Sequence, residues 1–161
     1  MTMVRLYVNG VEREVQVAPR DLLLDVLRGK LGLTSVHAGC EQGPCGACTV
    51  LVDGVTVRSC LMFAVQADGT MILTVEGLAS AGDDMHPIQE AFSECHALQC
   101  GFCTPAMVLT VVELLERDPA PDRVTIEAAL SGQLCRCTGY ESIVEAVQVA
   151  ATRLSGQEAK A

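Results

Sequence analysis

The sequence predicts an α+β fold, in which a strand-rich first half is followed by a helical second half. Short alternating segments with Asn-Gly and Asp-Gly turns fill residues 1–77, and such turns favour hairpins. Apolar residues recur at helical spacing after residue 85. We therefore expect two domains, at 1–77 and 85–155, joined by an acidic linker, SAGDDM, at 80–85. Residues 156–161 are expected to form a disordered tail.

The first half is expected to combine strands with one helix. A hairpin is predicted at 3–17, because VRLYV and VEREVQV flank an Asn-Gly turn. The segment DLLLDVLRGK at 21–30 predicts a helix that Asp21 caps, because its apolar residues form one stripe. Two short strands within 48–60 flank an Asp-Gly turn, and TMILTVEGL at 70–78 predicts a further strand.

The second half predicts four helices. Residues 86–98 carry a proline in the first helical turn, where the missing N–H is tolerated. Residues 104–118 are apolar on most sides, so this helix is expected to be central. A third helix at 125–132 is opened by Thr125, and a fourth spans 140–154.

Composition restricts the partners and the compartment. The 161 residues carry a net charge of -9, which argues against nucleic acid, because binding it needs a basic surface. No segment has the apolar run of a signal peptide or a membrane span. We therefore expect a soluble cytoplasmic protein, in which clustered cysteines indicate metal or redox chemistry. Of nine cysteines, Cys95 alone stands outside two tight groups, and a buried or half-buried thiol is expected there.

Four cysteines of the first half have the spacing C-x4-C-x2-C-x11-C. They are Cys40, Cys45, Cys48 and Cys60. The first three match the plant-type [2Fe-2S] spacing, in which the fourth thiolate arrives from a separate segment. Zinc and disulfides are the alternatives, although a structural zinc site usually takes two C-x2-C-like pairs. His37 could ligate iron only in a Rieske-type centre, and four cysteines leave no vacancy for it.

Glycines surround these cysteines. Gly39, Gly43 and Gly46 lie in the first cysteine loop, and Gly101 lies between two cysteines of the second half. Glycine adopts backbone angles that other residues avoid and lets the main chain approach a cluster closely. Backbone N–H groups that face cluster sulfurs tune the reduction potential. We therefore expect these four glycines to admit the backbone close to the clusters.

The second group has the spacing C-x2-C-x31-C-x-C. Its members are Cys100, Cys103, Cys135 and Cys137. Taken alone, this spacing is compatible with zinc as well as iron. Both pairs precede predicted helices, whose N-terminal N–H groups stabilise anionic thiolates. A helical arrangement with a cluster at one end is therefore expected.

Four motifs together resemble the iron–sulfur subunit of the xanthine oxidase family of molybdenum hydroxylases. They are GCEQGPCGACTV, RSC, QCGFCTPAM and LCRCTGY, and the resemblance spans residues 3–154. The VHAGC form is similar to the carbon monoxide dehydrogenase-like branch, within a bacterial group that includes aldehyde oxidoreductases. Ala106 and Pro44 stand where many relatives have Gly, and His37 stands where many have Lys. None of these departures touches an expected ligand.

The resemblance implies a fold, cofactors and partners. It implies a ferredoxin-like β-grasp domain with one [2Fe-2S] cluster on the first cysteine group. It also implies a four-helix-bundle domain with a second [2Fe-2S] cluster on the second group. The implied partners are a large subunit with molybdopterin and molybdenum and a medium subunit with FAD, in a heterotrimer or a dimer of heterotrimers. Gln99 and Cys137 match family positions near the molybdopterin.

The expected function is therefore electron transfer within a larger oxidoreductase. The chain shows no nucleotide fingerprint and no catalytic triad, so we expect no substrate site and no catalytic residue in it. Its two clusters would pass electrons between the molybdopterin centre and the FAD. A free-standing ferredoxin-type carrier and a zinc-stabilised interaction module are the alternatives.

Overall fold

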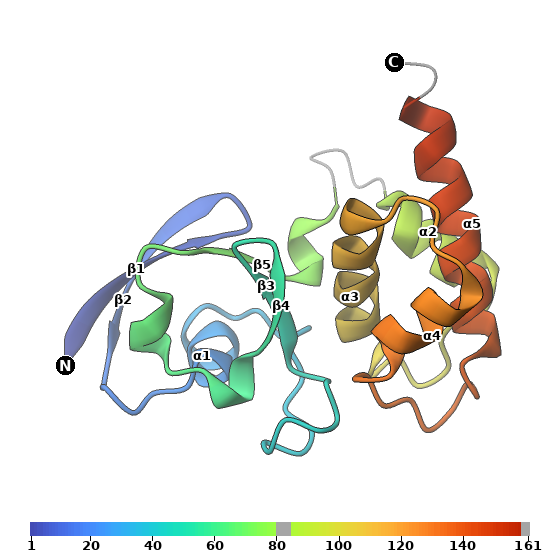
Figure 1. Ribbon diagram of the computed structural model, residues 1–161. Coiled ribbons are helices and arrows are strands. Elements are labelled where there is room, and N and C mark those ends of the chain that lie inside the picture. The colour runs from blue at the N-terminus through green and yellow to red at the C-terminus, as the bar shows by residue number, and fades with distance from the viewer. Residues whose placement is uncertain (80–84, 159–161) are drawn as a thin grey trace.

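The computed structural model describes residues 1–79 and 85–158, and it places a sheet beside a group of helices (Figure 1). The strands are β1 (Thr2–Val8), β2 (Val11–Val17), β3 (Thr49–Val52), β4 (Val55–Arg58) and β5 (Met71–Leu73). The α-helices are α1 (Leu23–Asp25), α2 (Pro87–Glu94), α3 (Thr104–Arg117), α4 (Arg123–Leu130) and α5 (Glu141–Glu158). The first half also has a π-helical turn, η1 (Val26–Lys30), and three 3₁₀ turns, η2 (Ser59–Leu61), η3 (Ala64–Ala67) and η4 (Val75–Gly77). The chain is therefore a mixed α/β protein, as its sequence predicts.

Two predicted segments extend beyond the described ranges. Residues 80–84 of the expected linker lie outside the described residues. Of the expected tail, residues 156–158 continue helix α5, and 159–161 lie outside the described residues. Among the helices that the structure describes, none has the length and apolarity that crossing a bilayer requires.

The five strands form one sheet in the order β2-β1-β5-β3-β4. Strands β1 and β5 run parallel, and the other neighbouring pairs are antiparallel. Both predicted two-residue hairpin turns are confirmed. Asn9 and Gly10 have φ angles of 52° and 78°, and Asp53 and Gly54 have 49° and 82°. Two successive positive φ angles are what a tight hairpin turn needs to match the twist of its strands.

The prediction for 21–30 is only partly right. Helical structure is present, but α1 is short and continues into the π-helical turn η1, where Leu31 N–H donates to the Val26 carbonyl. Asp21 does not cap it: its carboxylate accepts from the Ala18 N–H at 3.0 Å and from Lys30 Nζ at 2.9 Å. The buried residues of this segment are Leu23, Leu24, Val26 and Leu27. These four side chains pack into the core on one face of the sheet.

Strand β3 is buried along its whole length because it is packed on both faces. Val50 and Val52 belong to the core beneath the sheet, together with the α1 segment. Leu51 points the other way, into the core of the helical half. Helix α3 lies against this face, as Figure 1 shows. The apolar residues of β3 therefore contribute to the cores of both halves, and we call this contact between β3 and α3 the seam.

Helix α3 is central, as predicted. Its buried residues are Ala106, Met107, Val108, Leu109, Thr110, Val111, Val112 and Leu115. Helices α2 and α5 pack on each other, and α4 contacts α3 and α5. The prediction that Thr125 opens the third helix is wrong. Asp122 is the N-cap of α4, since its carboxylate accepts from the Thr125 N–H at 2.8 Å and satisfies a free donor of the first turn.

Candidate iron–sulfur centres

The fold of the first half gathers the four thiols of the first group. Cys48 immediately precedes β3 and Cys60 lies in η2, so the β3–β4 hairpin brings these two buried residues together. The Ser59 hydroxyl stabilises this end of the β3–β4 hairpin, because it donates to the Cys48 carbonyl at 2.7 Å. Cys40 and Cys45 are half-buried in the preceding loop.

Backbone N–H groups face these sulfurs. The N–H of Gln42 lies 3.4 Å from Cys40 Sγ. The N–H groups of Gln42 and Cys45 lower the pKa of Cys40 to about 7, and the Cys45 thiol contributes to this shift. Burial raises the pKa of Cys60 to about 11, and the neighbouring Cys48 thiol raises it as well. The loop therefore combines thiols that lie in pairs with N–H donors aimed at sulfur.

At two of the predicted glycines, this loop leaves little room for a side chain. A Cβ on Gly39 would lie 3.0 Å from Cys45 Sγ. Gly43 has φ of 94°, and a Cβ there would lie 2.7 Å from the Leu61 side chain. Gly101 of the second loop has φ of 82°, with open space where a Cβ would stand. Gly39 therefore lets the main chain pass beside the Cys45 thiol, and Gly43 lets it pass beside Leu61. Gly101 supplies a turn that other residues rarely adopt.

The second group lies at the starts of two helices, as predicted. Cys103 is the N-cap residue of α3, and Cys135 and Cys137 shortly precede α5. Cys100 and Cys137 are exposed, with their sulfurs 3.6 Å apart. The Tyr140 hydroxyl accepts from the Cys135 N–H at 2.8 Å, which holds the C-x-C turn against the helical core.

The thiols of the second group also interact in pairs. Burial raises the pKa of Cys103 to about 12, and the Cys135 thiol adds to the shift. Burial opposes ionisation of Cys135, but the hydrogen bonds to its sulfur together outweigh burial and leave the pKa of Cys135 lowered. They come from the Thr138 hydroxyl, 3.1 Å from the sulfur, the N–H groups of Thr138 and Cys137, and the Cys103 thiol. The Cys100 thiol raises the pKa of Cys137.

Paired thiols are the donor set that a two-iron core needs. In the described part of the chain, no three His, Cys, Asp or Glu side chains converge on the position of one metal ion. The sulfurs lie instead two by two, and each iron of a [2Fe-2S] core takes two thiolates. Each group could thus hold a two-iron cluster.

Gln99 and Cys137 lie together at the exposed end of the second group. The Gln99 side-chain amide donates to the Cys137 carbonyl at 3.1 Å, and both residues are exposed. Cys95 is half-buried at the end of α2, as expected, and burial raises the pKa of its thiol.

A buried glutamine joins the two cysteine loops. Gln133 is 2% exposed and lies two residues before Cys135. In the amide orientation that satisfies its neighbours, its NH₂ donates to the Gly46 carbonyl at 3.0 Å, and its oxygen accepts from Arg58 at 3.1 Å. Arg58 also donates to the Gly132 carbonyl at 2.7 Å. Sequence patterns did not single out Gln133 or Arg58, because neither a buried polar residue in a loop nor a half-buried arginine at the end of a strand has a periodic signal.

Gly46 also makes room for the other half of the chain. Its φ is 76°, and a Cβ there would overlap the Gln133 carboxamide and lie 2.6 Å from the Gly132 carbonyl oxygen. The space that glycine leaves open at this position is therefore filled by the other half of the chain. The Cys45 carbonyl beside it accepts from the Leu134 N–H at 2.9 Å, which ties the two loops together directly.

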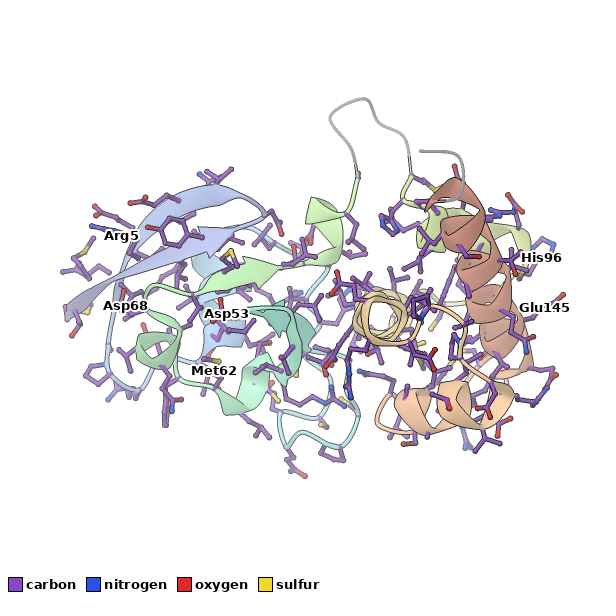
Figure 2. The ribbon with its side chains drawn as sticks, turned by 45° about the horizontal axis from the view of Figure 1, so that its top comes forward. Arg5, Asp53, Met62, Asp68, His96 and Glu145 are labelled. Atoms are coloured by element: carbon purple, nitrogen blue, oxygen red, sulfur yellow. The ribbon has the colours of Figure 1, made fainter. Side chains whose placement is uncertain are left out.

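The side chain of His37, a residue of the first loop, contacts the second loop. Its Nδ1 lies 2.8 Å from the Phe102 carbonyl oxygen, and the two rings stack with centroids 4.5 Å apart and planes 11° apart. Side chains fill the space between the sheet and α3 (Figure 2).

Comparisons with known proteins identify two [2Fe-2S] domains in this chain. Residues 6–75 match the model of the 2Fe-2S iron-sulfur cluster binding domain, and residues 74–148 match that of the [2Fe-2S] binding domain. The nicotine 6-hydroxylase small subunit of Paenarthrobacter nicotinovorans is 54% identical over 87% of this chain and 84% of its own length. The nicotinate dehydrogenase small FeS subunit of Eubacterium barkeri is 47% identical over 93% of this chain and 95% of its own length.

The chain belongs to the xanthine oxidase family, among its small iron–sulfur subunits. A chain of quinoline 2-oxidoreductase from Pseudomonas putida 86 matches this family member with a TM-score of 0.92 and 46% identity, covering 98% of both chains. The predicted resemblance is confirmed. Two [2Fe-2S] domains in one subunit of an oxidoreductase give this xanthine oxidase family subunit an electron-transfer role.

Proposed function

We propose that this subunit passes electrons between the molybdopterin centre of a large subunit and the FAD of a medium subunit. One cluster is held by Cys40, Cys45, Cys48 and Cys60. The other is held by Cys100, Cys103, Cys135 and Cys137. The observation that carries the proposal is the presence of one such thiol set in each half, with the two cysteine loops hydrogen-bonded to each other. The clusters supply one-electron chemistry, and the chain supplies their spacing and surroundings.

The chain's own residues have three tasks in this scheme. The N–H groups near Cys40 donate to sulfur and stabilise added negative charge. Burial of Cys48 and Cys60 keeps water from part of the first cluster. The Gln133 network holds the two loops at a constant separation. No step of substrate chemistry is assigned to this chain.

The exposed ends of the two sites suggest which partner each faces. Gln99 and Cys137 lie exposed beside the second group, with Leu134 also exposed, and we assign this end to the large molybdopterin-binding subunit. Leu61 and Phe63 are exposed near the first group, and we assign that end to the medium FAD-binding subunit. Apolar side chains left exposed on a subunit are typical of an obligate interface.

The finer architecture follows the same proposal. The first half, 1–77, is a ferredoxin-like β-grasp domain, supported by its sheet order and the α1 segment beneath it. The second half, 85–155, is a four-helix-bundle domain, supported by the packing of α2 to α5 around one core. We place the complex in the cytoplasm as a heterotrimer or a dimer of heterotrimers, because clustered thiols suit a reducing compartment.

Metal analysis of the complex tests the ligand assignment. Anaerobic purification should give about four irons and about four acid-labile sulfides per chain, as expected for two two-iron clusters. Cys45→Ser should remove or strongly perturb one EPR signal, and Cys100→Ser the other. Circular dichroism of each variant checks that the helices persist, because cluster loss couples to folding.

Two results would contradict the proposal. If either variant lost both signals while its helices persisted, or lost neither, the division of ligands between the halves would be wrong. If the chain purified as a monomer that passed electrons without a large or medium subunit, it would be a free carrier and not a subunit.

A further inference from the structure

His37 belongs to the first cysteine loop by sequence and to the second by contact. It stands three residues before Cys40. Its side chain nevertheless stacks on Phe102, which lies between Cys100 and Cys103, and its Nδ1 meets the Phe102 carbonyl at 2.8 Å. The two rings are nearly parallel, so the contact has both a packing and a polar component.

The polar component has only one possible direction. A backbone carbonyl accepts hydrogen bonds and cannot donate them, so Nδ1 of His37 carries the proton and donates it to the Phe102 oxygen. That carbonyl belongs to the same peptide group as the Cys103 N–H, which is one of the groups that favour the Cys103 thiolate. A donor on the oxygen of a peptide group polarises its N–H and fixes its plane. His37 is thus coupled to an N–H donor beside the second thiol group.

The segment that carries His37 is firmly held. Arg28 Nη1 donates to the carbonyl of Thr34 at 2.7 Å and to that of Val36 at 2.6 Å. The Ser35 N–H and hydroxyl both donate to the Glu76 carboxylate. These contacts reach the segment from η1 and η4, so the ring of His37 is presented to Phe102 from a fixed main chain.

We propose that His37 is a positioning residue for the second cluster, which it reaches across the seam, rather than for the first cluster whose ligands follow it in sequence. The inference rests on the ligand assignment proposed above. Added electrons put negative charge on the cluster, and a polarised Cys103 N–H stabilises that charge. Loss of the His37 donor should therefore lower the reduction potential of the second cluster and leave that of the first unchanged.

Three variants separate the components of the contact. His37→Phe retains an aromatic ring and removes the donor. His37→Asn removes the ring but keeps an N–H donor at the same number of bonds from the backbone as Nδ1. His96→Asn is the matched control, since His96 is an exposed histidine that Figure 2 places at the edge of the helical half remote from the sheet. Its φ of 50° is one that asparagine tolerates.

The measurement is an EPR-monitored redox titration of the complete complex, with iron content determined for each variant. Cys45→Ser and Cys100→Ser identify which signal belongs to which cluster. We expect His37→Phe to shift the second midpoint potential to more negative values and to leave the first unmoved. His37→Asn should restore most of that shift, and His96→Asn should change neither potential.

The outcomes distinguish failure of the ligand assignment from failure of the role proposed for His37. If the cysteine variants do not each remove a separate signal, the ligand assignment fails. If they do, and His37→Phe moves the first potential alone or moves neither, the role of His37 is refuted while the electron-transfer function stands. A shift in His37→Asn as large as that in His37→Phe would also refute the donor argument.

Discussion

Truncation of Gln133 tests whether the seam between the halves depends on buried hydrogen bonds. The perturbation is Gln133→Ala, at a side chain that is 2% exposed. Its amide donates to the Gly46 carbonyl and its oxygen accepts from Arg58. The hydroxyls of Thr49 and Thr110 also face this oxygen, but each has another acceptor, in Gly46 and Ala106 respectively. We therefore count one hydrogen bond for the two hydroxyls together, which gives the Gln133 side chain three hydrogen bonds in all.

The expected loss follows from that count. A net contribution of about 1 kcal/mol for each of three bonds gives about 3 kcal/mol. The cavity left by the shortened side chain adds about 1 kcal/mol, so the free energy of unfolding should fall by about 4 kcal/mol. Such a loss is a large fraction of the stability of an ordinary domain.

Anaerobic urea denaturation followed by circular dichroism measures this loss. Gln148→Ala is the matched control, because Gln148 is exposed on α5 and its truncation should cost less than about 0.5 kcal/mol. If Gln133→Ala lost no more stability than the control, the hydrogen bonds across the seam would contribute nothing net. The seam would then be held by the apolar contacts of Leu51 and α3 alone.

Two further predictions concern backbone space and protonation. Gly46→Ala should lose more stability in the same assay than Gly10→Ala. Both positions have positive φ, but only at Gly46 would a Cβ lie 2.6 Å from a backbone oxygen of the other half. Equal losses of stability in the two variants would contradict this reasoning. His86 caps α2 through a ring nitrogen that accepts a hydrogen bond from the Ile88 N–H. Burial lowers the pKa of His86 below the ordinary 6.5, although the charge of Glu90 opposes this shift. Glu116 lines the same pocket as His86. Because the unfolded chain binds the proton more readily, this stabilisation should be present above pH 6.5 and decline as the pH falls below it. His86→Asn keeps an acceptor that does not titrate, so its melting temperature should depend less on pH between 5 and 8; an unchanged pH dependence would exclude His86 as the cause.

Local chemistry explains why much of the fold was predictable. The turns at Asn9-Gly10 and Asp53-Gly54 need positive φ angles that few other residue pairs supply, so the hairpins follow from short stretches of chain. The central place of α3 follows from its apolar surface. Helix starts were less predictable, because Asp122 and Thr125 are both good capping residues, and the geometry of one turn selects Asp122.

The sequence by itself determined the chemistry: two sets of four thiols, their spacings and the glycines among them are properties of short segments. Only the tertiary structure decided how those sets meet. Gln133 is 84 residues from Thr49, and His37 is 65 residues from Phe102. Contacts between such distant residues leave no periodic pattern in either segment, because they depend on β3 being packed against the sheet core on one face and α3 on the other. The physical reason is that the spacing of thiols within one loop is set by the local sequence, whereas the contact between the two cysteine loops depends on the packing between the halves.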